Sequence, residues 1–179
     1  MKEIEVKARL RDKKAVVKKL KSIGCVFEVP VTQSDTVYAK VVGTVSKYLS
    51  SDVFLRIRVK NGKKIFFTVK KPLSNGLDKL EYEVVVNSKV EIEQAILLMG
   101  YKKAVEVNKT RIVAKYKERE ICIDEVQNLG TFIEVEELRA DGDSEKIQDE
   151  LFAFVESLGV SREDRVFSGY DILMLQKLK

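Results

Sequence analysis

The sequence contains neither histidine nor tryptophan among its 179 residues. Without an imidazole, the chain cannot supply a histidine base, a histidine-ligated zinc site or a serine–histidine pair. Any catalysis must therefore rely on carboxylates, lysine, arginine, tyrosine or a metal ion that prefers oxygen ligands.

Cysteine and proline are scarce as well, with two residues of each. Cys25 and Cys122 lack the spacing of a metal site, and the sequence has no N-terminal apolar signal segment. It also has no apolar run of about 18 residues, the length that a membrane helix needs. We therefore expect a reduced, cytoplasmic protein without a membrane partner. Pro30 and Pro72 mark no linker, so a single domain over residues 1–179 is predicted.

Charge of neither sign dominates the chain. Lysine and arginine number 33 against 28 aspartate and glutamate, which gives a net charge of +5. The basic residues form no long tract, so a nucleic-acid partner is not expected. Hydrophobic residues make up 45% and charged residues 34% of the chain, as is typical of a globular domain.

Apolar and charged residues alternate with a period of two through most of the chain, which indicates half-buried strands. From Val53 to Lys60, apolar residues alternate with positions that include Arg56 and Arg58. Asn61-Gly62 then predicts a tight hairpin turn. Further strands are predicted over 3–10, 32–41, 65–70, 79–87, 103–116, 119–127 and 131–138. Because closure removes exposed edges, this pattern predicts an α+β fold built on a closed or nearly closed antiparallel β-barrel.

Four amphipathic helices are predicted between and after the strands. The first begins after Asp12, the second after Ser88 and the third after Ser144, and each ends at a glycine. Ser88 and Glu91 form a capping-box pattern for the second helix. A fourth helix is predicted near residues 168–177, with a less regular apolar face.

Each of the first three helices follows a strand that carries a Glu-x-Glu pair. The pairs are Glu3/Glu5, Glu81/Glu83 and Glu134/Glu136. Glutamate is a poor strand residue, and such a pair places two like charges roughly 7 Å apart on one face. A single pair would indicate only a charged strand face in water. Its recurrence instead indicates that a divalent cation or facing cations offset the repulsion.

The helices determine which way the charged faces point. Their apolar stripes need the apolar faces of the strands, so the helices are predicted outside the barrel and the charged faces toward its lumen. The predicted lumenal residues are Glu3, Glu5, Lys7, Arg9, Arg56, Arg58, Lys70, Glu81, Glu83, Lys109, Arg111, Asp124, Glu134 and Glu136. Buried charges persist only when they are paired, hydrated or bound to a ligand or metal. Carboxylates grouped against cations therefore predict a site for a polyphosphate bound with Mg²⁺ or Mn²⁺.

The N-terminal strand, Glu3-Ile4-Glu5-Val6-Lys7, resembles the ExExK signature of the CYTH superfamily, the triphosphate tunnel metalloenzymes. Further segments resemble motifs of that family in the same order over nearly the whole chain. These segments are Gln33–Tyr38, Leu55–Arg58, Thr68–Lys70, Glu81–Glu83, Lys109–Arg111 and Cys122–Glu136. The subgroup that the sequence resembles most is the class IV adenylyl cyclase-like proteins.

This resemblance implies an eight-stranded antiparallel tunnel that binds an organic or inorganic triphosphate with a divalent metal. Because their carboxylates share the charged strand faces and repel one another, we predict that catalysis requires a divalent metal held chiefly by Glu5, Glu134 and Glu136. The implied metal ligands are Glu3, Glu5, Asp124, Glu134 and Glu136. The implied triphosphate ligands are Lys7, Arg9, Arg56, Arg58, Lys70, Lys109 and Arg111. Glu81 and Glu83 match the family's central pair, and their share in metal binding is left open.

Three functions fit these residues. The first is a cyclase that converts ATP to cyclic AMP and pyrophosphate. The second is a triphosphatase for inorganic tripolyphosphate, thiamine triphosphate or a nucleoside triphosphate. The third is a non-catalytic polyphosphate- or RNA-binding module, which would have no use for grouped carboxylates.

Recognition of a base has less support in the sequence than recognition of phosphate. Tyr38 is followed by Ala39, where cyclase-like members often carry an aromatic residue, and few amide or aromatic side chains share the lumenal faces. We therefore expect the triphosphate and metal to be recognised more strongly than the base. A small-molecule triphosphate is the expected partner, and a homodimer is left open.

Overall fold

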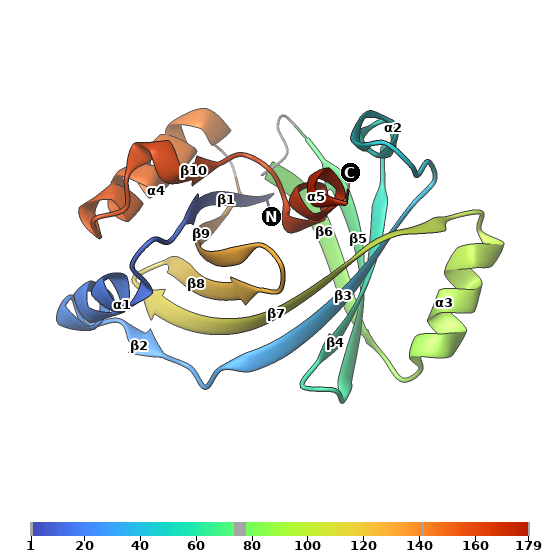
Figure 1. The fold of residues 1–179 in the computed structure, drawn as a ribbon, viewed down its shortest axis with the longest axis horizontal. Helices are drawn as coiled ribbons and strands as arrows, with labels where there is room; N and C mark the ends of the chain where they lie inside the picture. Colours follow the sequence, from blue (N-terminus) through green and yellow to red (C-terminus); the bar gives the residue numbers. More distant parts are fainter. Residues whose placement is uncertain (1, 74–77, 141, 179) are drawn as a thin grey trace.

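The computed structural model describes residues 2–73, 78–140 and 142–178. Within these residues, eight strands close into an antiparallel barrel in the order β1-β6-β5-β4-β3-β7-β8-β9, and β9 pairs back to β1 (Figure 1). The strands are β1 (Lys2–Arg9), β3 (Val31–Ala39), β4 (Phe54–Lys60), β5 (Lys64–Pro72), β6 (Asp78–Val86), β7 (Lys102–Tyr116), β8 (Arg119–Val126) and β9 (Gly130–Arg139). The predicted barrel is confirmed.

Two short strands, which the sequence did not predict, lie beside the barrel. β2 (Val26–Phe27) pairs with β7, and β10 (Arg165–Val166) pairs with β1. The predicted hairpin between β4 and β5 is present. Asn61 and Gly62 both have positive φ angles, 52° and 65°, as a two-residue hairpin turn with matching twist requires.

Strand register decides which side chains face inward. Between β1 and β9, Glu5 lies opposite Glu136 and Lys7 opposite Glu134. The intervening residues of β1, Ile4 and Val6, are fully buried on the outer face. Because side chains alternate along a strand, this register brings charged residues from the two strands together inside the barrel.

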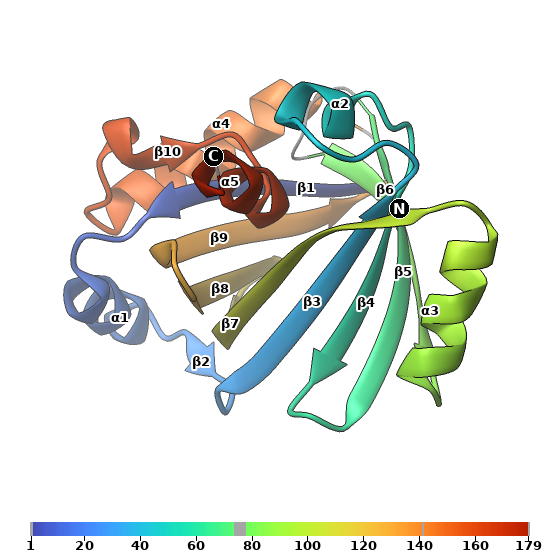
Figure 2. The ribbon, with the colours of Figure 1, turned by 45° about the vertical axis from the view of Figure 1, so that its right-hand side comes forward.

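Three helices cover the outer face, as predicted (Figures 1 and 2). They are α1 (Lys13–Ser22), α3 (Lys89–Leu98) and α4 (Ser144–Ser157). Helices α1 and α4 share one core with the outer residues of β1, β8 and β9, and Ile96 of α3 packs on Leu55 and Ile57 of β4. Asp12 and Ser88 cap the first two helices as expected, whereas α4 is capped by Asp143, one residue earlier than predicted.

The C-terminal helix α5 (Tyr170–Lys177) contacts a different surface. Its residues Tyr170 and Met174 pack against Val107 and Phe132, which lie on the same strand faces as the charged lumenal residues. A short helix that the sequence did not predict, α2 (Val45–Leu49), contacts α5, and a single 3-10 turn covers Arg162–Asp164. α5 therefore brings side chains from the end of the chain to the inner face of the barrel. None of the described helices has the length and apolar character to cross a membrane.

Candidate active site

A cavity of about 990 Å³ occupies the barrel. Its lining includes every predicted lumenal residue except Arg9 and Asp124. The cavity is at the upper end of the size range of pockets that bind drug-sized ligands, roughly 300 to 1,000 Å³. It is therefore large enough for a triphosphate together with an organic group.

The two exceptions occupy defined places. Arg9 is exposed, where its guanidinium donates to the Leu129 carbonyl oxygen at 2.9 Å and lies 4.8 Å from the centre of the Phe132 ring. Asp124 has no exposed surface and accepts two hydrogen bonds from Arg111, at 2.7 and 2.6 Å, and one from Lys109 at 3.2 Å. Asp124 thus orients two cations from behind the cavity wall.

Three carboxylates form the grouping best suited to a metal ion. Each of Glu3, Glu5 and Glu136 offers an oxygen atom, and these atoms lie within 4.8 Å of one another. Burial, together with the neighbouring carboxylates of Glu3, Glu5 and Glu134, raises the pKa of Glu136 to about 8. A group of hard oxygen donors whose charges repel one another fits Mg²⁺ or Mn²⁺. The other two predicted metal ligands, Asp124 and Glu134, lie outside this grouping and are paired with lysine and arginine.

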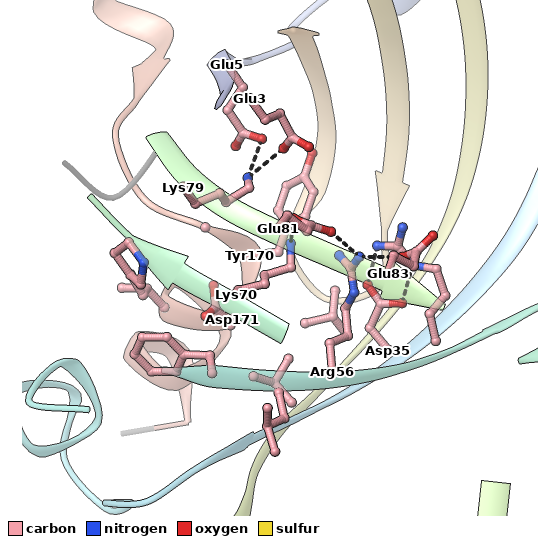
Figure 3. A pocket seen from close by; sticks show the side chains of 18 of the residues that line it. Glu3, Glu5, Asp35, Arg56, Lys70, Lys79, Glu81, Glu83, Tyr170 and Asp171 are labelled. Carbon is pink, nitrogen blue, oxygen red and sulfur yellow. Dashed lines mark hydrogen bonds and ion pairs between the residues drawn. The ribbon is translucent and has the colours of Figure 1, made fainter. Parts of the chain in front are cut away.

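Lys79 lies against two of these three carboxylates, those of Glu3 and Glu5, and was missing from the predicted site. Its ammonium is 3.0 Å from Glu3 Oε1 and 2.8 Å from Glu5 Oε2 (Figure 3). Burial opposes the charged ammonium, but the carboxylates of Glu5, Glu3 and Glu81 outweigh it and raise the pKa of Lys79. Lys79 therefore supplies a positive charge where a metal ion would also be attracted. The sequence did carry a signal, because Lys79 precedes Glu81 by two residues on the same strand face.

Glu134 joins two of the predicted phosphate ligands. Its Oε1 is 3.0 Å from the Lys7 ammonium, and its other oxygen accepts a hydrogen bond from Arg111. Burial would raise the pKa of Glu134, but Lys7, Arg111 and Lys109 outweigh it and hold the pKa well below its usual range. Glu134 is therefore ionised and fixes the positions of two cations that come from β1 and β7.

A second charged network joins β4, β5 and β6 (Figure 3). Arg56 contacts Glu81 at 2.7 Å and Glu83 at 3.1 Å, and Lys70 contacts Glu81 at 2.8 Å. Burial and the nearby charges of Arg56 and Lys79 lower the pKa of Lys70 to about 8. Burial opposes ionisation of Glu81, but Lys70 and Arg56 outweigh it and lower its pKa to about 2. Glu81 and Glu83 are thus partners of cations here, and the metal-type grouping contains neither of them.

Arg58 is held by Asp35, another residue that was missing from the predicted site. Its Nε and Nη2 atoms both donate to Asp35, each at 2.7 Å. Burial would raise the pKa of Asp35, but the paired guanidinium of Arg58 outweighs it and lowers the pKa. Asp35 was part of the Gln33–Tyr38 segment, and it alternates with Thr36 so as to face the lumen. Carboxylates therefore orient the predicted lysines and arginines, and an anionic ligand could take the place of these carboxylates as their partner.

The chain is similar in sequence to known proteins over most of its length. A family model described as the CYTH domain matches residues 1–170. A curated protein of Methanocaldococcus jannaschii, named a putative adenylate cyclase, is 30% identical over 171 residues, which cover 94% of this chain and 95% of that protein.

Solved structures share the fold. A protein from Pyrococcus horikoshii OT3 matches with a TM-score of 0.82 and 28% identity, over 98% of this chain and 99% of that one. A protein from Hippeastrum, described as a putative adenylyl cyclase with a dominant triphosphatase activity, matches with a TM-score of 0.57 and 20% identity. That match covers 93% of this chain and 91% of the Hippeastrum chain, and at this identity it bears on the fold alone.

Proposed function

Because this chain belongs to the CYTH domain family and is an enzyme, we propose that it acts on a nucleoside triphosphate bound inside the barrel with a divalent metal ion. The observation that carries this proposal is a single cavity in which a group of three carboxylates faces a wall of lysines and arginines. Phosphate oxygens and a hard metal ion are the ligands that these two surfaces attract.

The phosphate chain would contact the cations that line the cavity. The proposed phosphate ligands are Lys7, Arg56, Arg58, Lys70, Lys109 and Arg111. Each of them is paired with at least one carboxylate, so a bound phosphate would replace or share an existing partner. Arg9, which is exposed outside the cavity lining, is proposed as a ligand only for a group that reaches that end of β1.

Glu3, Glu5 and Glu136 are the residues that would hold the metal ion. A bound divalent ion supplies positive charge that neutralises phosphate oxygens and favours attack at phosphorus. Glu134 and Asp124 are proposed to act through the cations that they contact. We propose Mg²⁺ or Mn²⁺ because each prefers oxygen ligands of this kind.

Cyclisation of ATP is the first candidate reaction, and the name of the relative from M. jannaschii supports it. In this reaction the ribose 3′-hydroxyl loses its proton and attacks the α-phosphorus. The bond from that phosphorus to the bridging oxygen breaks, and pyrophosphate leaves. The lysines and arginines of the cavity would stabilise the negative charge that develops on the pyrophosphate. The cavity volume of about 990 Å³ leaves room for the nucleoside beside the phosphates.

Hydrolysis of the terminal phosphate is the second candidate. Among the cavity-lining residues that the structure describes, Gln33 is the one side chain that carries an amide, so groups able to read a purine edge are few. A non-catalytic binding module is disfavoured because the chain is an enzyme.

The products of turnover distinguish these reactions. The purified protein would be incubated with ATP, thiamine triphosphate or tripolyphosphate and with Mg²⁺ or Mn²⁺, and the products would be separated by chromatography. We expect cyclic AMP and pyrophosphate from ATP, and no turnover in excess EDTA. ADP and phosphate would instead establish the triphosphatase. Absence of turnover with all three substrates and both metals would contradict the proposed function.

A further inference from the structure

Tyr170 is a cavity residue that comes from a helix and is not one of the phosphate or metal ligands proposed above. It is the first residue of α5, and its side chain lines the barrel cavity with 7% of its surface exposed (Figure 3). The proposed phosphate and metal ligands come from the barrel strands. The C-terminal helix therefore places an aromatic side chain next to charged groups from the strands.

The Tyr170 ring contacts two of the proposed phosphate ligands. The Lys7 ammonium lies 4.2 Å from the ring centre and the Lys109 ammonium lies 4.8 Å from it. An aromatic face attracts a cation at these distances, and the attraction is stronger where water is excluded. Lys7 and Lys109 are 2% and 7% exposed, so both ammoniums are largely removed from water. The ring thus helps to hold two cations from β1 and β7 side by side.

The ring itself is fixed from several directions. Phe132 packs edge-on against it with the ring centres 5.1 Å apart. The residue that follows, Asp171, accepts a hydrogen bond from the Tyr48 hydroxyl of α2, and Lys7 donates to the carbonyl oxygen of Ser168 at 3.3 Å. A side chain held in this way is pre-organised for binding, because little conformational freedom remains to be lost.

The packing contacts of Tyr170 account for its ring but not for its hydroxyl group. Its oxygen is buried, and no described residue forms a hydrogen bond of good geometry with it. The nearby carboxylate of Asp124 already accepts two hydrogen bonds from Arg111 and one from Lys109. Burial and the carboxylates of Glu134 and Asp124 raise the pKa of Tyr170 well above its usual value, so the hydroxyl keeps its proton and remains a donor. A buried donor without an acceptor destabilises the folded protein, and phenylalanine would provide the same ring contacts without that cost.

We propose that Tyr170 is a phosphate-binding residue whose hydroxyl donates a hydrogen bond to an oxygen of the bound triphosphate, next to the contacts of Lys7 and Lys109. This inference rests on the proposed function, because it assigns a partner from the same ligand. It also makes α5 a part of the site, since the helix delivers a neutral donor next to Lys7 and Lys109.

Tripolyphosphate binding measured by calorimetry in the presence of Ca²⁺ tests the inference. Tyr170→Phe removes the hydroxyl and keeps the ring, and we expect it to weaken binding about tenfold, as loss of a hydrogen bond to a charged group does. Tyr170→Leu also removes the aromatic face and should weaken binding further. Tyr101 provides the matched control, because its ring holds Lys40 at 4.6 Å outside the cavity lining. Tyr101→Phe should bind within about twofold of the wild type.

Thermal melting of the ligand-free variants separates a binding role from a structural one. Tyr170→Phe should melt at the same temperature as the wild type or higher, because it removes a buried hydroxyl without a partner. Wild-type affinity in Tyr170→Phe, or weaker binding that is matched by a lower melting temperature, would overturn the inference while leaving the proposed function intact. Failure of the wild type itself to bind tripolyphosphate would overturn both.

Discussion

Glu134 and Glu136 are two residues apart on β9 and face the same cavity, yet their surroundings move their pKa values in opposite directions. Glu134 contacts Lys7 and Arg111 and stays ionised. Glu136 is buried beside Glu3 and Glu5, and its pKa rises to about 8. Two identical side chains therefore have different roles, one holding cations and the other belonging to a group of repelling carboxylates.

Replacing Glu134 should damage catalysis more than folding. We expect Glu134→Gln to lower kcat/KM by a hundredfold or more, about 3 kcal/mol, because Lys7 and Arg111 lose the charge that positions them. Steady-state kinetics with the preferred triphosphate would measure the change. Glu125→Gln is the control, since Glu125 is exposed and pairs only with Lys13 among the described residues. Full activity of Glu134→Gln, or wild-type activity that survives excess EDTA, would argue against this role.

The raised pKa of Glu136 makes stability depend on pH. The folded protein keeps a proton on Glu136 up to a pH of about 8, whereas the unfolded chain loses it near the ordinary value of 4.5. The contribution of Glu136 to stability therefore falls as the pH rises from 4.5 and levels off above 8. Glu136→Gln removes this effect, so it should stabilise the metal-free protein at pH 9 by at least about 1 kcal/mol, or roughly 3 °C in Tm.

Melting curves in EDTA at pH 5, 7 and 9 would show the effect. The advantage of Glu136→Gln over the wild type should be small at pH 5 and largest at pH 9, with Glu125→Gln showing no such trend. A variant that is less stable than the wild type at pH 9 would mean that the repulsion among Glu3, Glu5 and Glu136 is already relieved.

Among the described residues, the contact between β1 and β6 has the fewest paired residues of any two neighbouring barrel strands. Two registered pairs join these strands, Glu3 with Lys79 and Ile4 with Asp78, whereas β1 and β9 are paired from Lys2 to Arg9. The ion pairs of Lys79 with Glu3 and Glu5 connect β6 to β1 at this contact. Lys79 thus links the two strands and neutralises the carboxylates at the same time.

Lys79→Met should destabilise the metal-free protein and strengthen metal binding. Without the ammonium, Glu3 and Glu5 repel each other, and Mn²⁺ meets no competing positive charge between them. We expect Mn²⁺ affinity to rise about tenfold at pH 8.5, and Mn²⁺ to raise the Tm of this variant more than that of the wild type. Calorimetry and melting curves without nucleotide would measure both quantities. Lys64→Met, at the start of β5 and outside the cavity lining, is the control, and an unchanged Mn²⁺ affinity in Lys79→Met would refute the competition.

The alternation of apolar and charged residues along each strand was enough to predict the barrel and most of the residues on its inner face. This is because inward and outward positions follow a period of two. It could not predict contacts between strands that are distant in the sequence. Lys79 was on the correct face, but its contact with Glu3 follows from the β1–β6 register. Arg9 has the inward parity of Lys7, yet it is exposed at the end of β1.

The C-terminal helix illustrates a second limit of the sequence pattern. Its apolar face predicted a helix near 168–177, and α5 covers Tyr170–Lys177. The apolar pattern did not indicate that Tyr170 would enter the cavity, because the same pattern serves for packing on the outer or the inner face of a barrel. Val107 and Phe132, apolar positions on otherwise charged faces, were the signal that something packs there.

For the whole molecule, ligand binding depends more on where the charges lie than on the net charge of +5. Nine lysines and arginines line the cavity, whereas Gln33 is the one lining side chain that carries an amide among the described residues. We therefore expect tripolyphosphate to bind within about tenfold of ATP, a difference near 1.4 kcal/mol, and AMP to bind at least a hundredfold more weakly than either. Calorimetric titrations with Ca²⁺ would compare the three ligands. A preference of a thousandfold for ATP over tripolyphosphate would reveal a base pocket and favour a dedicated cyclase.

The most direct test of a metal-assisted triphosphate site inside the barrel is a crystal structure of the protein soaked with Mn²⁺ and tripolyphosphate. We expect an anomalous scattering peak for manganese among the carboxylates of Glu3, Glu5 and Glu136. We also expect the phosphate chain to lie in the cavity against Arg56 and Arg111. Manganese bound away from these three carboxylates, or phosphate bound only on the outer surface of the barrel, would contradict the proposed site.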